Sequence, residues 1–385
     1  MTEWKECKLG EFANIIMGQS PESSYYNIKG EGIPFLQGNR TFGFKYPTFD
    51  TYTTFITKEA NKDDVIMSVR APVGDLNIAP ERLCLGRGVC ALRAINGEQL
   101  FLYYLMKANQ KQLLNKENGT VFGSVNRNDI SNLIINLPSL ENQKKIATIL
   151  STLDDKIELN NKINDNLEQQ AQAIFKSWFV DFEPFGGKMP DDWKIGKLSE
   201  IADYLNGLAM QKFRPAENEE ALSVLKIKEL RQGICDDSSE LCSPNKIKPK
   251  FIINDGDVIF SWSGSLLVDI WCGGKCGLNQ HLFKVTSKNY DKWYYYLWTK
   301  HHLDRFIFLA ADKATTMGHI KREELDKAEV VIPSESDMKK IGSVLQPIID
   351  MIINNKIENI RLSKIRDELL PQLMNGSLSV DEVVL

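Results

Sequence analysis

The chain has 385 residues, of which 43% are hydrophobic and 25% charged, and its formal net charge at pH 7 is −4. This length allows two or three domains with their own cores, and no apolar run reaches the roughly 18 residues that a membrane helix needs. The first residues, Met1–Lys5, lack a signal-peptide pattern, so a cytoplasmic protein is expected. The acidic excess lies on two long predicted helices, which leaves the rest of the chain almost neutral and able to carry local basic faces.

One unit is written twice along the chain, a pattern that has to be recognised before any fold is assigned. The matched segments follow one another in the same order in both copies: Trp4–Ala13 with Trp193–Ala202, Asp64–Ser68 with Asp257–Ser261, Leu137–Pro138 with Ile332–Pro333, and Lys144–Ile146 with Lys339–Ile341. The offset drifts only from 189 to 195 residues. Duplication with small insertions explains this pattern.

Each copy begins with a globular stretch of mixed α and β character. Short β-branched or aromatic runs bounded by Gly, Pro and Asp predict strands at Val65–Val69, Val89–Leu92, Phe251–Ile253 and Val258–Trp262. Helical apolar spacing predicts helices within Leu100–Leu114 and Trp293–Leu309. A closing strand is expected at Ile130–Leu137 and again at Leu325–Ile332.

Each globular stretch is followed by a long helix with a coiled-coil repeat. Apolar residues recur in steps of four and three from Ile146 to Trp178, and the same ladder returns 195 residues later from Ile341 to Leu373. Pro347 and Pro371 interrupt the second helix, which predicts a bend near Ser343–Pro347 and a frayed end past Leu370. The expected organisation is a first domain at 1–138, a central helix at 139–183, a second domain at 184–333 with a linker at 184–192, and a C-terminal helix at 334–385.

Two Asn residues stand at matching positions of the two ladders. If the helices pair antiparallel within the chain, a single register sets Asn160 opposite Asn359 and Asn164 opposite Asn355. Buried amides cost stability but fix register, because a slip of one layer leaves them opposite Leu or Ile. The alternative is that these amides contact another subunit. The expected fold is therefore α+β: two similar mixed domains joined by two long helices that pair as an antiparallel coiled coil with pseudo-twofold symmetry.

Motifs of catalysis and metal binding are missing from the sequence. There is no P-loop, no Gly-rich dinucleotide loop and no Asn-Pro-Pro-aromatic segment of an amino-methyltransferase. The four His show no metal spacing, and Cys235, Cys242, Cys272 and Cys276 are interpreted as reduced thiols in preference to a zinc site. We expect neither an active site nor a metal in this chain.

Polar, Gly-rich turns with basic residues remain, in equivalent places of both copies. Arg, Asn and Gln can hydrogen-bond base edges, whereas Ser, Thr and the amides near Gly suit phosphates. In the first copy the candidate DNA-binding residues are Gln19, Ser20, Gln37, Asn39, Arg40, Arg70, Arg87, Thr120 and Ser124. In the second copy they are Lys226, Lys228, Ser263, Ser265, Asn279, Gln280, Lys313, Thr315, Thr316 and His319. Different side chains on similar turns suggest related platforms that read different sequences.

Five stretches of the sequence are distinctive: Leu137–Ala147, Leu153–Asn160, Phe175–Pro184, Leu369–Gly376 and Asp64–Gly74. With these stretches, and over almost its whole length, the chain resembles the specificity subunit of type I restriction–modification systems. The resemblance implies a non-catalytic subunit that reads a bipartite duplex DNA target, one half-site per domain. It also implies that the helices set the spacing and dock two methyltransferase subunits. S-adenosylmethionine, ATP and Mg would then belong to these and to the restriction endonuclease/translocase subunits.

Two alternatives come from other functional classes. One is an enzyme, a methyltransferase or nuclease in its own right, which the missing motifs oppose. The other is a coiled-coil scaffold without intrinsic DNA specificity. Sequence-selective retention of duplex DNA by the chain together with its methyltransferase subunit distinguishes the scaffold from a specificity subunit.

Overall fold

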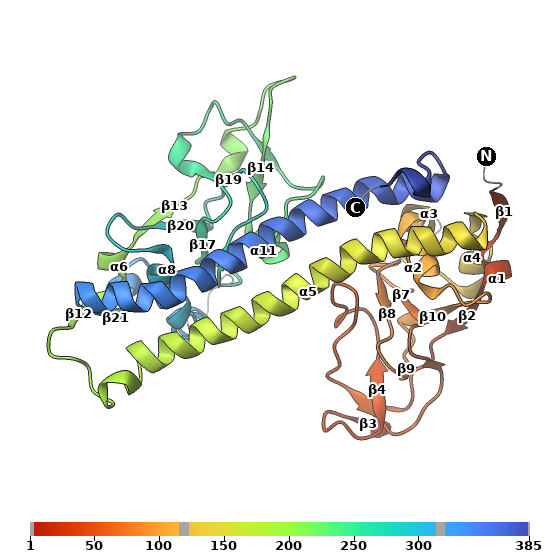
Figure 1. Ribbon diagram of the computed structural model, residues 1–385, viewed down its shortest axis with the longest axis horizontal. Helices are drawn as coiled ribbons and strands as arrows, with labels where there is room; N and C mark the ends of the chain where they lie inside the picture. The colour runs from red at the N-terminus through yellow and green to blue at the C-terminus, as the bar shows by residue number, and fades with distance from the viewer. Residues whose placement is uncertain (1–3, 115–122, 313–319, 384–385) are drawn as a thin grey trace. The chain divides into compact units, whose positions relative to one another are not determined.

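The computed structural model describes residues 4–114, 123–312 and 320–383 (Figure 1). The chain divides into two compact units: unit 1 comprises residues 1–158 and 362–385, and unit 2 comprises residues 159–361. Each unit therefore contains a part of both long helices. Among the helices of the described ranges, none combines the length and apolarity that crossing a membrane requires.

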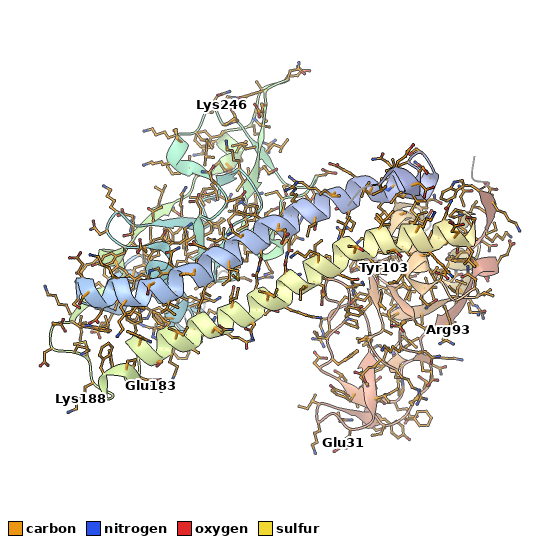
Figure 2. All side chains as sticks on the ribbon, in the orientation of Figure 1. Glu31, Arg93, Tyr103, Glu183, Lys188 and Lys246 are labelled. Atoms are coloured by element: carbon orange, nitrogen blue, oxygen red, sulfur yellow. The ribbon has the colours of Figure 1, made fainter. Side chains whose placement is uncertain are left out.

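Unit 1 is a mixed α and β structure. Its strands are β1 (Lys5–Lys8), β2 (Ala13–Met17), β3 (Tyr26–Asn27), β4 (Ile33–Leu36), β5 (Tyr52–Thr53), β6 (Glu59–Ala60), β7 (Val65–Ser68), β8 (Leu76–Ile78), β9 (Leu83–Leu85), β10 (Val89–Ala94) and β11 (Ile134–Leu137). Its short helices are α1 (Leu9–Phe12), η1 (Ser23–Tyr25), α2 (Gln99–Ala108), α3 (Gln110–Leu114), α4 (Arg127–Ser131) and η5 (Val380–Glu382). In Figure 2, Glu31 lies at the end of this unit remote from the long helix α5, whereas Tyr103 lies beside that helix.

Unit 2 has a similar order of elements, with the additional helix α7. Its strands are β12 (Lys194–Lys197), β13 (Asp203–Asn206), β14 (Leu222–Leu225), β15 (Leu241–Cys242), β16 (Ile252–Ile253), β17 (Val258–Ser261), β18 (Leu267–Ile270), β19 (Cys276–Leu278), β20 (Leu282–Thr286) and β21 (Glu329–Ile332). Its short helices are η2 (Glu183–Phe185), α6 (Leu198–Ile201), η3 (Met210–Lys212), α7 (Ile227–Gln232), η4 (Pro249–Phe251), α8 (Lys292–His301), α9 (Leu303–Asp312) and α10 (Glu323–Asp326).

The four-stranded antiparallel sheets of the two units share one topology. The order β2-β10-β7-β8 in unit 1 corresponds to β13-β20-β17-β18 in unit 2. In each unit the first strand also pairs antiparallel with the last, β1 with β11 and β12 with β21. A second sheet in each unit contains one parallel pair, β4 with β9 and β14 with β19. The expected closing strands are β11 and β21. They are shorter than predicted, because the first residues of each run form the helices α4 and α10.

The main core of each unit lies between the antiparallel four-stranded sheet, a buried helix and the long helices. In unit 1 the residues from Phe101 to Met106 of α2 are all buried, since this helix packs against β7, β8 and β10 as well as the long helices. In unit 2 the aromatic helix α8 occupies the equivalent place, and its tryptophans pack around Phe175 and Phe179. Burial on all sides explains why these helices are apolar without an obvious polar face.

The two long helices are α5 (Leu140–Phe179) and α11 (Glu335–Asn375), 40 and 41 residues long. Helix α11 includes both Pro347 and Pro371. The prediction of a frayed end past Leu370 is wrong, because burial of Leu373 and Met374 in the unit 1 core holds the last turn in helical form. The bend near Ser343–Pro347 stays a prediction.

The long helices contact each other within both units, with opposite chain directions. In unit 1 Asp154 of α5 binds Arg366 of α11, and in unit 2 Asn160 of α5 binds Asn359 of α11. Moving forward along α5 thus means moving backward along α11. The predicted fold class, two α/β domains with two long helices that pair antiparallel, is confirmed.

Candidate nucleic-acid interface

Three loops of unit 1 meet where β2, β4 and β9 end. The backbone amides of Gly86 and Gly88 donate to the carbonyls of Leu36 (2.7 Å) and Gln37 (3.0 Å). From the loop after β2, the amides of Gly18 and Gln19 donate to Val89 (3.0 Å) and Leu85 (2.9 Å). We call this set of backbone hydrogen bonds the loop frame. It fixes the positions of three loops with few contributions from side chains.

Unit 2 builds the same loop frame from equivalent residues. The amide of Gly207 donates to the carbonyl of Leu282 (3.0 Å), and the amide of Leu208 donates to Leu278 (2.9 Å). The amide of Asn279 donates to the carbonyl of Leu225 (3.2 Å), as Gly86 does to Leu36 in unit 1. The two copies thus keep the same backbone geometry.

A close backbone approach explains one glycine of each loop frame. A Cβ atom on Gly18 would lie 2.1 Å from the carbonyl oxygen of Gly86, and one on Gly207 would lie 2.1 Å from that of Asn279. Both distances are far below van der Waals contact. Glycine is therefore required at the same point of both units, because any side chain would separate the loops.

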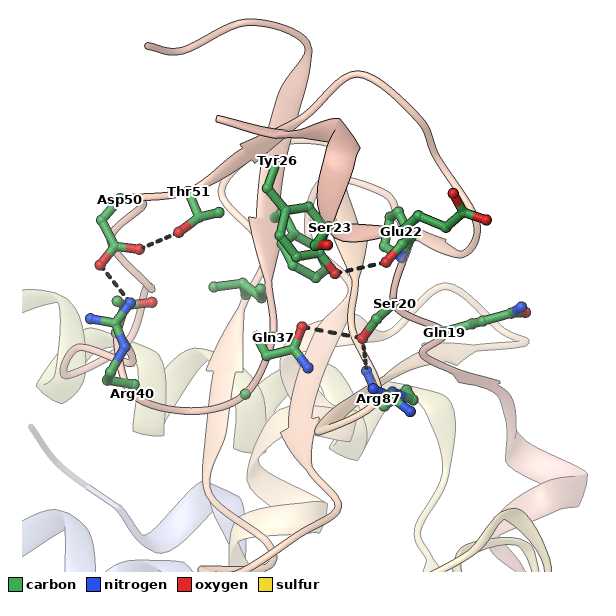
Figure 3. A pocket seen from close by; sticks show the side chains of 15 residues that line it. Gln19, Ser20, Glu22, Ser23, Tyr26, Gln37, Arg40, Asp50, Thr51 and Arg87 are labelled. Carbon is green, nitrogen blue, oxygen red and sulfur yellow. Dashed lines mark hydrogen bonds and ion pairs between the residues drawn. The ribbon is translucent and has the colours of Figure 1, made fainter. Parts of the chain in front are cut away.

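Side chains of the unit 1 frame line a surface hollow of about 770 Å³ (Figure 3). Five of the predicted residues border it: Gln19, Ser20, Gln37, Arg40 and Arg87. The Ser20 hydroxyl donates to Gln37 Oε1 (3.2 Å) and accepts from the Arg87 amide (3.1 Å). Candidate residues that the sequence placed on three separate loops therefore lie together at this hollow.

Arg40 stands at another edge of this hollow and is held by an acidic partner. Its guanidinium donates to Asp50 Oδ2 at 2.6 Å, and both side chains are largely exposed. The hydrogen bond from Arg40, followed by one from Thr51, lowers the pKa of the Asp50 carboxyl. Tyr26 and Phe35 also border the hollow and stack with ring centroids 4.7 Å apart. Polar donors thus stand around an aromatic pair.

The loop frame of unit 2 carries a different set of side chains. Ser263 Oγ lies 2.9 Å from His281 Nδ1, and the Gln280 amide nitrogen lies 3.3 Å from His281 Nε2. If Gln280 donates to Nε2, the ring proton is on Nδ1 and is donated to Ser263. The Trp262 indole donates to Asn206 Oδ1 (3.1 Å) and stands beside the imidazole, with ring centroids 6.2 Å apart.

Several predicted residues have other partners. Asn39 donates to Asp75 (2.6 Å), and Lys228 binds Asp236 and Ser238 on the segment after α7. The remaining described candidates stay next to the frames: Arg70 bridges to Ser124, Lys226 binds Glu240 (2.7 Å), the Ser265 carbonyl accepts from Ser261, and Asn279 belongs to the frame itself. Thr120, Lys313, Thr315, Thr316 and His319 lie outside the described residues.

Sequence reasoning left Tyr26, Phe35, Trp262 and His281 out of the candidate set. His281 could have been found by aligning the two copies, because it stands at the position of the frame residue Gly88 of unit 1. Tyr26 and Phe35 carry no such signal, since aromatic residues in short strands usually belong to the core.

The long helices carry their own polar layers, both within unit 2. Asn160 Nδ2 donates to Asn359 Oδ1 (2.9 Å) and to Glu358 Oε2 (2.7 Å), and Asn355 Nδ2 donates to Asn164 Oδ1 (2.9 Å). These are the two pairs that the ladder predicted.

Two units with one loop frame and different side chains, joined by the paired long helices, define a duplicated two-unit α/β protein. In the part of the chain that the structure describes, no group of three or more His, Cys, Asp or Glu could hold a metal ion. The family model for the type I restriction modification DNA specificity domain matches residues 1–169 and 190–362. The chain belongs to this family.

Curated relatives match over nearly full length. The MjaIX specificity subunit of a type I restriction enzyme from Methanocaldococcus jannaschii is 28% identical over 99% of this chain and 95% of its own. The HindI specificity subunit from Haemophilus influenzae is 23% identical over 98% and 100%. A solved S subunit from M. genitalium, 16% identical, shares the fold with a TM-score of 0.59 over 97% of this chain and 96% of that chain.

The chain is therefore a DNA specificity subunit of a type I restriction–modification system. A specificity subunit is the non-catalytic component of such an enzyme, and the cofactors belong to the modification and restriction subunits. It works as part of a complex that assembles with DNA.

Proposed function

We propose that each loop frame reads one half-site of a bipartite duplex DNA target. The recognition domains would be residues 1–138 and 184–333, and the long helices at 139–183 and 334–385 would set the distance between the half-sites. The observation that carries this proposal is the repetition of one backbone frame with different side chains. A frame that is kept while its side chains change is what reading two different sequences requires.

The side chains of the frames suit different contacts. In unit 1, Arg87 and Gln37 can form bidentate hydrogen bonds with guanine and adenine edges in the major groove. In unit 2, Gln280 and His281 offer amide and imidazole groups, and Lys226 brings a cation suited to phosphate. The two half-sites should therefore differ in sequence.

The polar layers Asn160–Asn359 and Asn164–Asn355 would fix the register of the spacer. Exposed faces of the long helices would dock two methyltransferase subunits, which bind S-adenosylmethionine. Restriction subunits that use ATP and Mg would join this assembly. The cytoplasm, where the DNA is, is the expected location.

Methylation specificity of the reconstituted complex tests the proposal. We would assemble the chain with its modification subunits and sequence the methylated positions of a randomised DNA library. Arg87→Ala should relax selectivity in one half-site only, and Gln280→Ala in the other, each by about 10–100-fold for one lost bidentate contact.

Arg82→Ala provides a matched control, because Arg82 is an exposed arginine of unit 1 whose guanidinium binds Glu59 away from the frame. It should leave both half-sites unchanged. Equal relaxation of both half-sites by Arg87→Ala would contradict the assignment of one frame to one half-site. A complex that retains no duplex selectively would favour the scaffold alternative.

A further inference from the structure

A buried ion pair between the long helices occurs in unit 1 and is replaced by apolar residues in unit 2. Arg366 Nη1 donates to Asp154 Oδ1 at 2.7 Å, and their side chains are 9% and 1% exposed. The Tyr104 hydroxyl donates to the second oxygen, Asp154 Oδ2, at 2.8 Å. Burial opposes the charge of Arg366, but Asp154 and the neighbouring Asp367, which Arg366 binds at 2.8 Å, together outweigh it and raise the pKa of the guanidinium. We call Tyr104, Asp154 and Arg366 the charged layer.

The counterparts of these three residues in the repeat are all apolar. Asp154 corresponds to Ile349 and Arg366 to Ala171 at the offset of 195 residues. Tyr104 corresponds to Leu297, because α2 and α8 align over ten residues each. Ile349, Ala171 and Leu297 are 0–2% exposed and belong to the same core. One copy thus has a charged layer at the position where the other has an apolar layer.

The Asn layers do not distinguish one long helix from the other. Asn355 and Asn359 of α11 repeat Asn160 and Asn164 of α5. Two copies of α5 from different chains could therefore pair antiparallel and still set Asn160 opposite Asn164. The same holds for two copies of α11. The Asn layers can fix register, but they leave the identity of the partner helix open.

The charged layer resolves this ambiguity. In a pair of two α5 helices with the same register, Asp154 would face Ala171 of the second chain. In a pair of two α11 helices, Arg366 would face Ile349. A pair of α5 helices would bury each Asp154 without its cation. A pair of α11 helices would leave each buried Arg366 with only the exposed Asp367 of its own helix (2.8 Å). A buried charge that loses its buried partner is far costlier than an apolar layer. Only the pairing of α5 with α11 brings Asp154 and Arg366 together.

We propose that the charged layer selects α5–α11 pairing and excludes association of this chain with a second copy through like helices. The duplicated sequence makes such exchange an inherent hazard, since both helices present almost the same ladder. A single asymmetric layer removes this hazard, because it destabilises both the α5–α5 pair and the α11–α11 pair. This inference concerns assembly of the chain and does not depend on the DNA contacts proposed above.

The test replaces the charged layer of unit 1, in the full-length chain, by the apolar residues of the corresponding layer of unit 2. Tyr104→Leu, Asp154→Ile and Arg366→Ala together give unit 1 the residues that already pack in unit 2. Chains with light and heavy isotopes would be unfolded together, refolded, treated with a lysine cross-linker and examined by mass spectrometry. Links between Lys156 of α5 and Lys364 of α11, both exposed, report α5–α11 pairing. Links between Lys162 of a light and Lys162 of a heavy chain report exchange.

Wild type should give Lys156–Lys364 links and essentially no light–heavy Lys162 links. The triple variant should increase the light–heavy links by about tenfold or more, since the penalty on like pairing is gone. Asp154→Ile with Arg366→Ala, which keeps Tyr104, should give the same result and serves if the triple variant folds poorly. Arg366→Lys keeps a cation opposite Asp154 and should behave as wild type.

Lys145→Ala is the matched control for loss of an ion pair between α5 and the C-terminal segment. Lys145 binds Asp381 at 3.0 Å, but both side chains are exposed, so its loss should not promote exchange. The proposal is overturned if folded variants with the apolar layer exchange no more than wild type, or if wild type exchanges freely.

Discussion

The Asn160–Asn359 layer allows a quantitative test of how the helix pair is held. Asn160 is 1% exposed and donates to both Asn359 and Glu358, whereas Asn359 is half-buried and donates to Asn161 (2.8 Å). Asn160→Leu therefore leaves the Asn359 carbonyl oxygen without its donor beside a new apolar side chain. Asn359→Leu leaves Asn160 with Glu358 as its remaining acceptor. The first substitution should be the more damaging.

An unsatisfied buried polar group costs roughly 1–3 kcal/mol. We expect Asn160→Leu to lower the free energy of unfolding by about 2 kcal/mol and Asn359→Leu to lower it by about 1 kcal/mol. The double variant should lie within about 1 kcal/mol of wild type or above it, because a Leu–Leu layer leaves no amide unsatisfied. The coupling between the two positions is then positive and about 2–3 kcal/mol or more, at least as large as the larger single effect.

Urea unfolding followed by tryptophan fluorescence measures these differences in unit 2, which contains both Asn positions. All tryptophans except Trp4 lie within residues 159–361, so the signal reports mainly on unit 2. Additive losses in the double variant would refute the reasoning, because they would mean that the two amides act independently. Leu at all four Asn positions should raise stability further while broadening the set of cross-links between α5 and α11, which measures register.

Three further perturbations act on other parts of the molecule. Replacing only Asp154 by Leu leaves the buried Arg366 with the exposed Asp367 as its remaining ion-pair partner and should cost about 3 kcal/mol of unfolding free energy in thermal or urea denaturation, while Asp154→Ile with Arg366→Ala should cost much less. Burial lowers the pKa of His302 to about 4, so the unfolded chain binds the proton more tightly. Stability should therefore fall as the pH drops from about 6.5 to 4, by about 2–3 kcal/mol relative to His302→Gln, in urea titrations at each pH. Gly18→Ala and Gly207→Ala should each separate the loops of one frame and reduce selectivity at one half-site of methylated DNA, with the other half-site as internal control.

The long helices are predictable from the sequence because their pattern is local and repeated. A step of three and four residues over ten rungs has few interpretations, and the matched Asn positions specify which rungs face each other. The role of Arg366 was not predictable in the same way. Its partner Asp154 lies one residue away from the apolar stripe and far away in sequence, so no periodicity connects the two.

The candidate interface is predictable only in part, for a physical reason. Gly-rich turns identify the loops, and Gln19, Gln37 and Arg87 indeed meet in one hollow. The frame that unites them consists of backbone hydrogen bonds, which any sequence can form. Lys228 shows the consequence, because it belongs to a promising polar segment but binds Asp236 and Ser238 instead.

The placement of the helix ends explains why the recognition domains and the spacer are not separate modules. The core of unit 1 includes Ile146 and Leu150 from α5 together with Leu373 from α11. The core of unit 2 likewise includes Phe175 from α5 and Ile341 from α11. Each recognition domain is therefore completed by one end of each long helix, so a change in the register of the helices must strain both cores. If the long helices act as the proposed spacer, their register would act on the loops of each unit through the core that the helix ends complete.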